Sequence, residues 1–294
     1  MFKEKLILGM LAETALHPGS DRPRPGIDLP VQREKHTGFP IIQASGLKGA
    51  MREKAEVKGM DSALIEIIFG PENADHAGAL ALTEARLLAF PVRSLSGVFV
   101  WITCPAFLNR YLRDLKMLGA SPSLPPFDTF PELTADKAFV LENSGLSDPL
   151  VLEDLLFHLD ATKSNEMKQW QEETEKFLPE DSSSPHRYIR EKFRKHLVLI
   201  DDESAQYLTR YGTQVTARNV LDENKTSKNL WYEETLPPDS VFYCLALFSD
   251  PRTSTSYTAT DLKTVFSQKI PPYLQIGGEE TLGEGWLYLR CREV

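Results

Sequence analysis

One carboxylate in a Pro- and Gly-rich segment has the setting of a ligand-binding side chain. Asp28 follows the run from Pro18 to Gly26, and side chains in such loops contact ligands more often than they fill a core. An aspartate there can act as a base toward a ribose 2′-hydroxyl or hold a divalent ion that stabilises charge at a phosphate. Because aspartate is a weak base near neutral pH, metal assistance is the better-supported chemistry. Taken by itself, a lone loop aspartate is more typical of a turn or a cap.

Positive and polar groups flank Asp28 on both sides. We expect Ser45 to cap a helix over about residues 46–58, with Lys48 and Arg52 one turn apart on it. The free N–H groups of that first turn and the two cations predict a seat for a phosphate. His17, at the expected end of the first strand, can donate to a phosphate or act as an acid near neutral pH.

Two groups in the second half of the chain could join this chemistry. The run from Gly277 to Gly285 is expected to bring backbone N–H groups close to a phosphate chain, although it is neither a Walker A nor a Rossmann sequence. Its four glycines are Gly277, Gly278, Gly283 and Gly285. Glu233 and Glu234 can support a metal or position a nucleotide, but solvent exposure is the more ordinary expectation. Trp231 can stack on a base or serve only in packing.

Composition limits the class of protein. With 294 residues and 41% hydrophobic content the chain can bury a substantial core, and no apolar run is long enough to span a bilayer. We therefore expect a soluble, cytoplasmic protein. The three cysteines are far apart and lack CxxC spacing, which predicts neither a disulfide framework nor a zinc site. The net charge of −9 disfavours general nucleic-acid binding, but residues 22–58 carry eight Lys or Arg against four Asp or Glu.

The pattern of elements predicts an α+β protein. Leu6, Leu8 and Met10 alternate with positions that look more exposed, which predicts a first strand ending near His17. The expected helix at 46–58, strands at 79–91 and 97–104 and a helix at 106–118 give βαββα, the start of an RRM-like repeat. We expect one domain over 1–294. Its inserted parts are a catalytic loop at 17–44, a mainly helical insertion at about 120–210, and a protruding β-hairpin at about 213–236.

Five blocks of the sequence carry a family resemblance. They lie in one order along nearly the whole chain, and residues 120–210 add little to the match. The blocks are the loop from Gly26 to Glu34, the helix start Ser45 to Gly49, the run Ala85 to Ser94, the stretch Asn229 to Glu234 and the run Gly277 to Gly285. Together they resemble the repeated backbone subunit of type III-B CRISPR effector complexes, a member of the RAMP superfamily.

The resemblance implies a fold and a function. The fold is an RRM-like (ferredoxin-like) antiparallel-sheet core with helical insertions and a β-hairpin thumb, which would carry Trp231, Glu233 and Glu234. The function is cleavage of target single-stranded RNA paired to a guide CRISPR RNA, within a complex of further copies and other type III-B subunits and with no membrane partner. Asp28 takes the cleavage role, assisted by weakly held Mg²⁺ or Mn²⁺, and His17 contacts RNA. Ser45, Lys48, Arg52 and the four glycines bind guide RNA.

Two other functions stay open. The chain can be a scaffold that lines the guide RNA while Asp28 only shapes a loop. It can also be a nuclease that processes guide precursors by metal-independent acid and base groups, for which His17 and His36 are few candidates.

Overall fold

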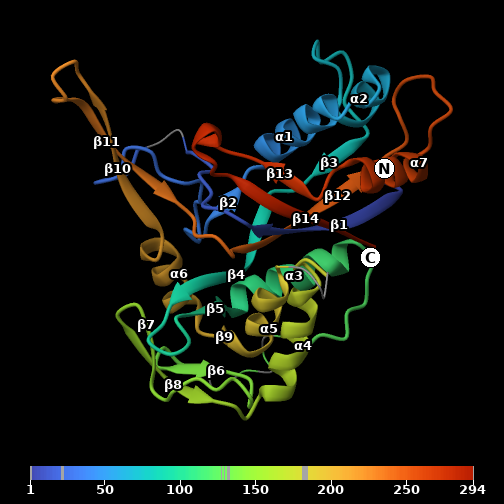
Figure 1. Cartoon of the computed structure of the whole chain (residues 1–294). Coiled ribbons are helices and arrows are strands. Elements are labelled where there is room, and N and C mark those ends of the chain that lie inside the picture. The colour runs from blue at the N-terminus through green and yellow to red at the C-terminus, as the bar shows by residue number, and fades with distance from the viewer. Residues whose placement is uncertain are drawn as a thin grey trace.

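The computed structural model describes residues 2–20, 23–126, 128, 130, 133–180 and 185–293 (Figure 1). It is a mixed α/β structure with one large, mostly antiparallel sheet and seven α-helices within the described residues. The helices are α1 (Ala44–Val57), α2 (Ser62–Phe69), α3 (Pro105–Met117), α4 (Ser164–Glu175), α5 (Arg187–His196), α6 (Asp202–Tyr211) and α7 (Ala259–Lys269), with a 3-10 turn η2 (Glu280–Leu282).

The strands are distributed along the whole described part of the chain. They are β1 (Glu4–Ala12), β2 (Ile41–Ile42), β3 (Leu80–Leu82), β4 (Ala85–Arg93), β5 (Phe99–Thr103), β6 (Lys137–Phe139), β7 (Leu150–Leu152), β8 (Leu155–Asp160), β9 (Leu197–Leu199), β10 (Gln214–Leu221), β11 (Ser227–Thr235), β12 (Val241–Phe248), β13 (Tyr273–Gln275) and β14 (Trp286–Glu293). The main sheet has the order β13-β14-β1-β12-β4-β5-β9-β6-β8-β7, with β2 beside β4 and β3 beside β12. Only β5 with β9 and β6 with β8 pair in parallel among these strands.

Helices cover both faces of the sheet around β1. Figure 1 shows α1, α2 and α7 on one side and α3, α4 and α5 on the other. Leu6, Leu8 and Met10 belong to the core that includes residues of α1 and α7, whereas Ile7 and Leu11 belong to the core under α3 and α4. The expectation that the positions between Leu6, Leu8 and Met10 are exposed is therefore wrong, because an inserted helical layer covers the second face.

The strand that lies between β1 and β4 in the central sheet is not the one expected from the sequence. The strand expected at 97–104 is present as β5, but it pairs with the end of β4 and with β9. The neighbour of β1 and of the start of β4 is β12, which follows about 140 residues later in the chain. The first strand also ends at Ala12 instead of near His17. Local patterns predict that a strand exists, but they do not identify its partner.

The insertion at 120–210 contains strands as well as helices. Its helices α4, α5 and α6 are accompanied by β6, β7, β8 and β9, which extend the sheet beyond β5. Fully buried Phe177, just after α4, packs on β1 at Gly9. The insertion is thus part of the core.

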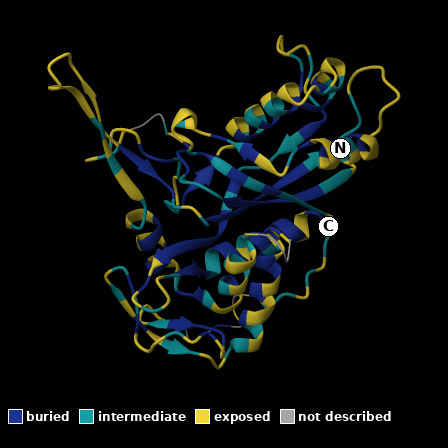
Figure 2. Ribbon diagram, viewed as in Figure 1, coloured by how far each residue is buried: buried dark blue, intermediate teal, exposed yellow. Residues whose placement is uncertain are grey.

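The predicted hairpin is present as a separate two-stranded sheet. Among the strands of the described residues, β10 and β11 form a sheet only with each other, and they project from the body (Figure 1). Most of their residues toward the tip are exposed (Figure 2).

The cysteines are free thiols, with Cys104 and Cys244 buried and Cys291 half-buried. Burial raises the pKa of Cys291 to about 11, which keeps this thiol protonated near neutral pH. Among the described residues, no helix combines the length and the apolar character needed to cross a bilayer.

Gly9 offers a test of the contact between the insertion and β1. A Cβ at this position would overlap the ring of Phe177, so we expect Gly9→Ala to lower the free energy of unfolding by about 1–3 kcal/mol. Gly49→Ala is the matched control, because a Cβ there meets nothing within 4 Å and alanine favours a helix interior by roughly 1 kcal/mol. Urea denaturation should therefore give changes of opposite sign, and equal changes would contradict this packing.

Candidate functional site

Asp28 lies at the base of the hairpin with its carboxylate held from one side. The N–H groups of Asp28 and Leu29 both donate to the Tyr232 carbonyl, at 3.0 Å each. The Tyr232 N–H in turn donates to Asp28 Oδ2 at 2.8 Å. A turn before it is closed by bonds between Arg24 and Ile27. The exposed Asp28 side chain is thereby fixed in orientation on β11.

Glu234 joins the Asp28 loop to the hairpin through a fully buried carboxylate. It accepts hydrogen bonds from the Arg33 guanidinium at 2.7 Å, from the Val31 N–H at 3.0 Å and from the Thr213 hydroxyl at 2.9 Å. Arg24 adds a fourth contact at 3.3 Å. The expectation that Glu234 is exposed is wrong, because it neutralises two arginines of the loop that covers it.

Glu233 is equally buried but lies on the opposite face of β11. Neither of its carboxylate oxygens has a hydrogen-bond partner among the described residues. Charged groups near it are His17, with Nδ1 at 3.7 Å, Arg218, with Nε at 3.6 Å, and the like-charged carboxylate of Glu279. Burial raises the pKa of the Glu233 carboxyl above its ordinary value. Its expected exposure is also wrong, since the glycine-rich loop covers this face.

His17 is enclosed under the glycine-rich loop. Its side chain is 9% exposed, and its Nδ1–H donates to the Glu234 carbonyl at 2.7 Å. A Cβ at Gly19 would lie 2.9 Å from Nε2, and a Cβ at Gly278 would lie 3.0 Å from Cδ2. His17 is therefore largely buried and is bonded to the hairpin strand.

The glycine-rich loop, defined as residues 277–285, packs tightly on the chain around His17. Its N–H groups donate to protein carbonyls at Gly278 (3.0 Å to His17), Gly283 (3.0 Å to Glu280) and Gly285 (2.8 Å to Ala15). A Cβ on Gly277 or Gly285 would overlap a backbone carbonyl, and both have positive φ. The glycines therefore permit close packing, and three of the four amides expected to face a phosphate are already paired.

The start of α1 is tied to the loop that carries Asp28. Gln43 occupies the N-cap position of the helix, and Ser45, which was expected there, lies inside the first turn. The Gln43 N–H donates to Gln32 Oε1 at 2.8 Å. Lys48 Nζ donates to the Leu80 carbonyl at 2.7 Å, and burial, followed by the charge of Arg52, lowers the pKa of Lys48. Arg52 itself bonds the Gly70 carbonyl and Glu56. Ser45 and Lys48 line a pocket of about 340 Å³.

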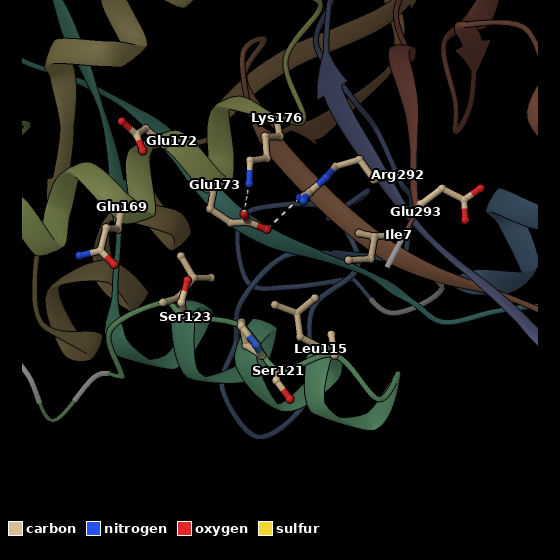
Figure 3. Close-up of a pocket in the computed structure, with 13 residues that line it drawn as sticks. Ile7, Leu115, Ser121, Ser123, Gln169, Glu172, Glu173, Lys176, Arg292 and Glu293 are labelled. Atoms are coloured by element: carbon tan, nitrogen blue, oxygen red, sulfur yellow. Dashed lines mark hydrogen bonds and ion pairs between the residues drawn. The ribbon is translucent and has the colours of Figure 1, made fainter.

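A second pocket, of about 420 Å³, lies between α3, α4 and β14 (Figure 3). In it Glu173 accepts from Lys176 at 2.7 Å and from Arg292 at 2.8 Å. Tyr111 also donates to this carboxylate. It contains none of the site residues expected from the sequence, and Lys176 and Arg292 are both paired with Glu173 within the protein.

Comparison with known proteins identifies the family. A family model of the RAMP superfamily matches residues 10–288. The chain belongs to the RAMP superfamily. This confirms the family expected from the sequence blocks.

Similar proteins narrow the relationship. This RAMP protein is 34% identical to the CRISPR system Cmr endoribonuclease Cmr4 of Pyrococcus furiosus, over 98% of this chain and 96% of the relative. The crystal structure of oligomeric Cmr4 from Pyrococcus furiosus matches with a TM-score of 0.75 at 31% identity, covering 99% of this chain and 98% of that one. A chain of the cryo-EM structure of the type III-B Cmr-beta bound to cognate target RNA has a TM-score of 0.73 at 21% identity, covering 99% and 98% respectively. That last likeness concerns the fold.

Three arginines of this RAMP protein's site were not singled out in the sequence. Arg24 and Arg33 hold Glu234, and Arg218 lies between Glu233 and Glu284. For Arg24 and Arg33, their place in the basic segment 22–58 was a sequence signal that they could belong to a site. No local spacing connects a residue near position 30 to one near 234, so the pairing itself required the fold.

No group of three or more His, Cys, Asp or Glu side chains that could hold a metal ion occurs within the described ranges. Asp28 is a single carboxylate with one oxygen already bonded to Tyr232. This arrangement does not fit a metal held by protein ligands alone. It fits a hydrated Mg²⁺ or Mn²⁺ that takes its other ligands from water and a phosphate.

Glu234 provides a stability prediction. Glu234→Gln removes the charge opposite Arg33, whose side chain is only 11% exposed, and we expect a loss of about 3 kcal/mol in unfolding free energy. Chemical denaturation would measure it. A loss below about 0.5 kcal/mol, as for a surface substitution, would contradict the proposed importance of the pair.

Glu233→Gln, on the neighbouring residue, should have the opposite effect. Because the pKa of Glu233 is raised on folding, the folded state binds this proton more tightly, and the associated stability is lost as pH rises through that raised pKa. We expect Glu233→Gln to raise Tm at about pH 8 and leave it unchanged at about pH 4. Thermal melts across this range measure the difference, and a lower Tm at pH 8 would show that the charged form is stabilised.

Proposed function

We propose that this RAMP protein is a backbone subunit of a type III-B CRISPR effector complex, which binds guide RNA and cleaves complementary target RNA at Asp28. The observation that carries the proposal is the exposed Asp28 carboxylate, held in one orientation by Tyr232 at the base of a projecting hairpin. The 34% identity to a Cmr endoribonuclease across 98% of the chain supports the same activity. We place the protein in the cytoplasm, where guide and target RNA meet.

The chemistry proposed for Asp28 depends on its placement. Asp28 would hold a weakly bound Mg²⁺ or Mn²⁺, which would supply positive charge at the scissile phosphate. The chain's own contribution is to fix the carboxylate through Tyr232 and to hold the hairpin beside it through Glu234. The alternative role, a base toward the ribose 2′-hydroxyl, uses the same orientation.

We infer an RRM-like, ferredoxin-like core for this fold. Four strands and two helices follow the chain in the order β1, α1, β4, β12, α7, β14. In the sheet the strands lie in the order β14-β1-β12-β4, and each neighbouring pair is antiparallel. This supports the βαββαβ arrangement of that fold.

The hairpin is proposed to act as a thumb that enters the duplex of guide and target. Its isolation from the main sheet and its exposed residues support this role. Several copies are proposed to line the guide RNA head to tail, and the 31% identity to an oligomeric Cmr4 supports association between copies. A head-to-tail assembly does not close on itself by symmetry, so other subunits of the type III-B complex would end it.

A scaffold without catalysis is the alternative. It is favoured by one observation, the lack of clustered metal ligands around Asp28 in the described part of the chain. A guide-precursor nuclease based on acid and base groups is less supported, because His17 is enclosed.

Asp28→Asn tests the proposal in the complex reconstituted with guide RNA. The amide keeps an acceptor for Tyr232 N–H but loses the charge, so we expect target cleavage to fall by about 100-fold or more with target binding unchanged. EDTA should have the same effect on the native complex.

Asp75→Asn, on an exposed loop, is the matched control and should cleave normally. Cleavage that survives both Asp28→Asn and EDTA would leave the chain as an RNA-binding scaffold.

A further inference from the structure

Arg218 connects the hairpin to the glycine-rich loop. Its guanidinium Nη2 lies 3.4 Å from Glu284 Oε1, and its Nε lies 3.6 Å from Glu233 Oε2. Arg218 belongs to β10, Glu233 to β11 and Glu284 to the loop, so one cation contacts both strands and a third segment. The side chains of Arg218 and Glu284 are 27% and 23% exposed. We call these three residues the Arg218 cluster.

The Arg218 cluster lies next to Tyr232, the residue that holds Asp28. In the hairpin register Ala217 faces Tyr232 and Arg218 faces Trp231. Tyr232 exchanges backbone and side-chain hydrogen bonds with Asp28. A displacement of β10 at Arg218 would therefore reach the Asp28 contact through one cross-strand pair.

The far end of the cluster is fixed to the body. Glu284 lies beside Gly285, whose N–H donates to the Ala15 carbonyl at 2.8 Å. The Glu284 carbonyl accepts a hydrogen bond from the Gln275 side chain at 2.8 Å, and the Glu284 N–H donates to the Glu279 carbonyl. Arg218 thus ties a projecting strand to a segment that the sheet holds in place.

The cluster is incompletely paired. Arg218 Nε, Glu284 Oε2 and both Glu233 carboxylate oxygens are buried without a hydrogen-bond partner among the described residues. One guanidinium also faces two carboxylates. Loss of Arg218 would therefore leave both carboxylates without this positive charge, whereas loss of the Glu284 charge would remove the contact between the loop and the hairpin.

We propose that Arg218 is a positioning residue for RNA cleavage, which couples the glycine-rich loop to the hairpin strand that holds Asp28. The inference rests on the function proposed above. Arg218 does not touch the reacting atoms. It sets the angle of the hairpin base, and with it the place of the Asp28 carboxylate relative to the target strand.

The test compares single-turnover cleavage and target affinity in complexes reconstituted with guide RNA. We expect Arg218→Gln and Glu284→Gln each to slow cleavage roughly tenfold while the target Kd changes by less than about threefold, since small displacements of a reacting group are costly. The double variant should be no slower than either single variant, because each single substitution already removes the same contact between Arg218 and Glu284. Arg218→Lys should keep most of the rate, because the contact to Glu284 uses a single nitrogen.

Arg93→Gln is the matched control. Arg93, at the end of β4, forms an ion pair at 2.8 Å with Glu153, between β7 and β8, and has no ion pair with the hairpin or the glycine-rich loop in the described structure. It should leave the cleavage rate unchanged.

Glu284→Gln separates positioning from a direct phosphate contact by Arg218. If Arg218 bound phosphate, removing the competing Glu284 charge would tighten target or guide binding and maintain cleavage, and that result would overturn the proposal. Native rates in both Gln variants would overturn it as well.

Hydrogen exchange of the isolated chain gives a measurement that does not need cleavage. We expect Arg218→Gln to speed exchange of the Tyr232 and Leu29 amides roughly tenfold, with Arg93→Gln unchanged. Unchanged exchange in Arg218→Gln would reject the coupling. A native complex that fails to cleave would reject the proposed function, while the exchange result would still decide whether Arg218 holds the hairpin.

Discussion

The buried carboxylate of Glu234 is the interaction on which the site depends. It lies in a strand of the hairpin, yet its partners Arg24, Val31 and Arg33 come from a loop about 200 residues earlier. A charge removed from water is tolerated only when its partners are in place, so the loop and the hairpin stabilise each other. Asp28 lies within that loop, and its orientation follows from the same docking.

The two faces of the hairpin base have separate tasks. Alternation along β11 directs Glu234 toward the Asp28 loop and Glu233 toward His17 and the glycine-rich loop. The Glu234 carboxylate accepts hydrogen bonds on both oxygens, whereas neither oxygen of the buried Glu233 carboxylate has a hydrogen-bond partner in the described structure. The hairpin is therefore anchored firmly on the side of Asp28 and more loosely on the side of the glycines.

Sequence patterns predicted the existence of most elements, including the hairpin and the loop that carries Asp28. They failed where the answer depended on what covers a residue. Ile7 and Glu233 looked exposed because their covering layers come from distant parts of the chain. The place of β12 beside β1 also has no local signal, since its partner lies more than 200 residues away. Glu234 could be recognised as a site residue, but its burial follows only from the two arginines.

The order of the central sheet has a consequence for synthesis of the protein. β1 is made before both of its neighbours, which are β12 at residues 241–248 and β14 at residues 286–293. One edge of β1 therefore lacks its partner until residues 241–248 have left the ribosome, and the other edge until residues 286–293 have done so. An apolar strand with open edges is prone to association with other chains. The separation of β1 from both partners therefore leaves an apolar strand exposed to such association while the intervening residues are made.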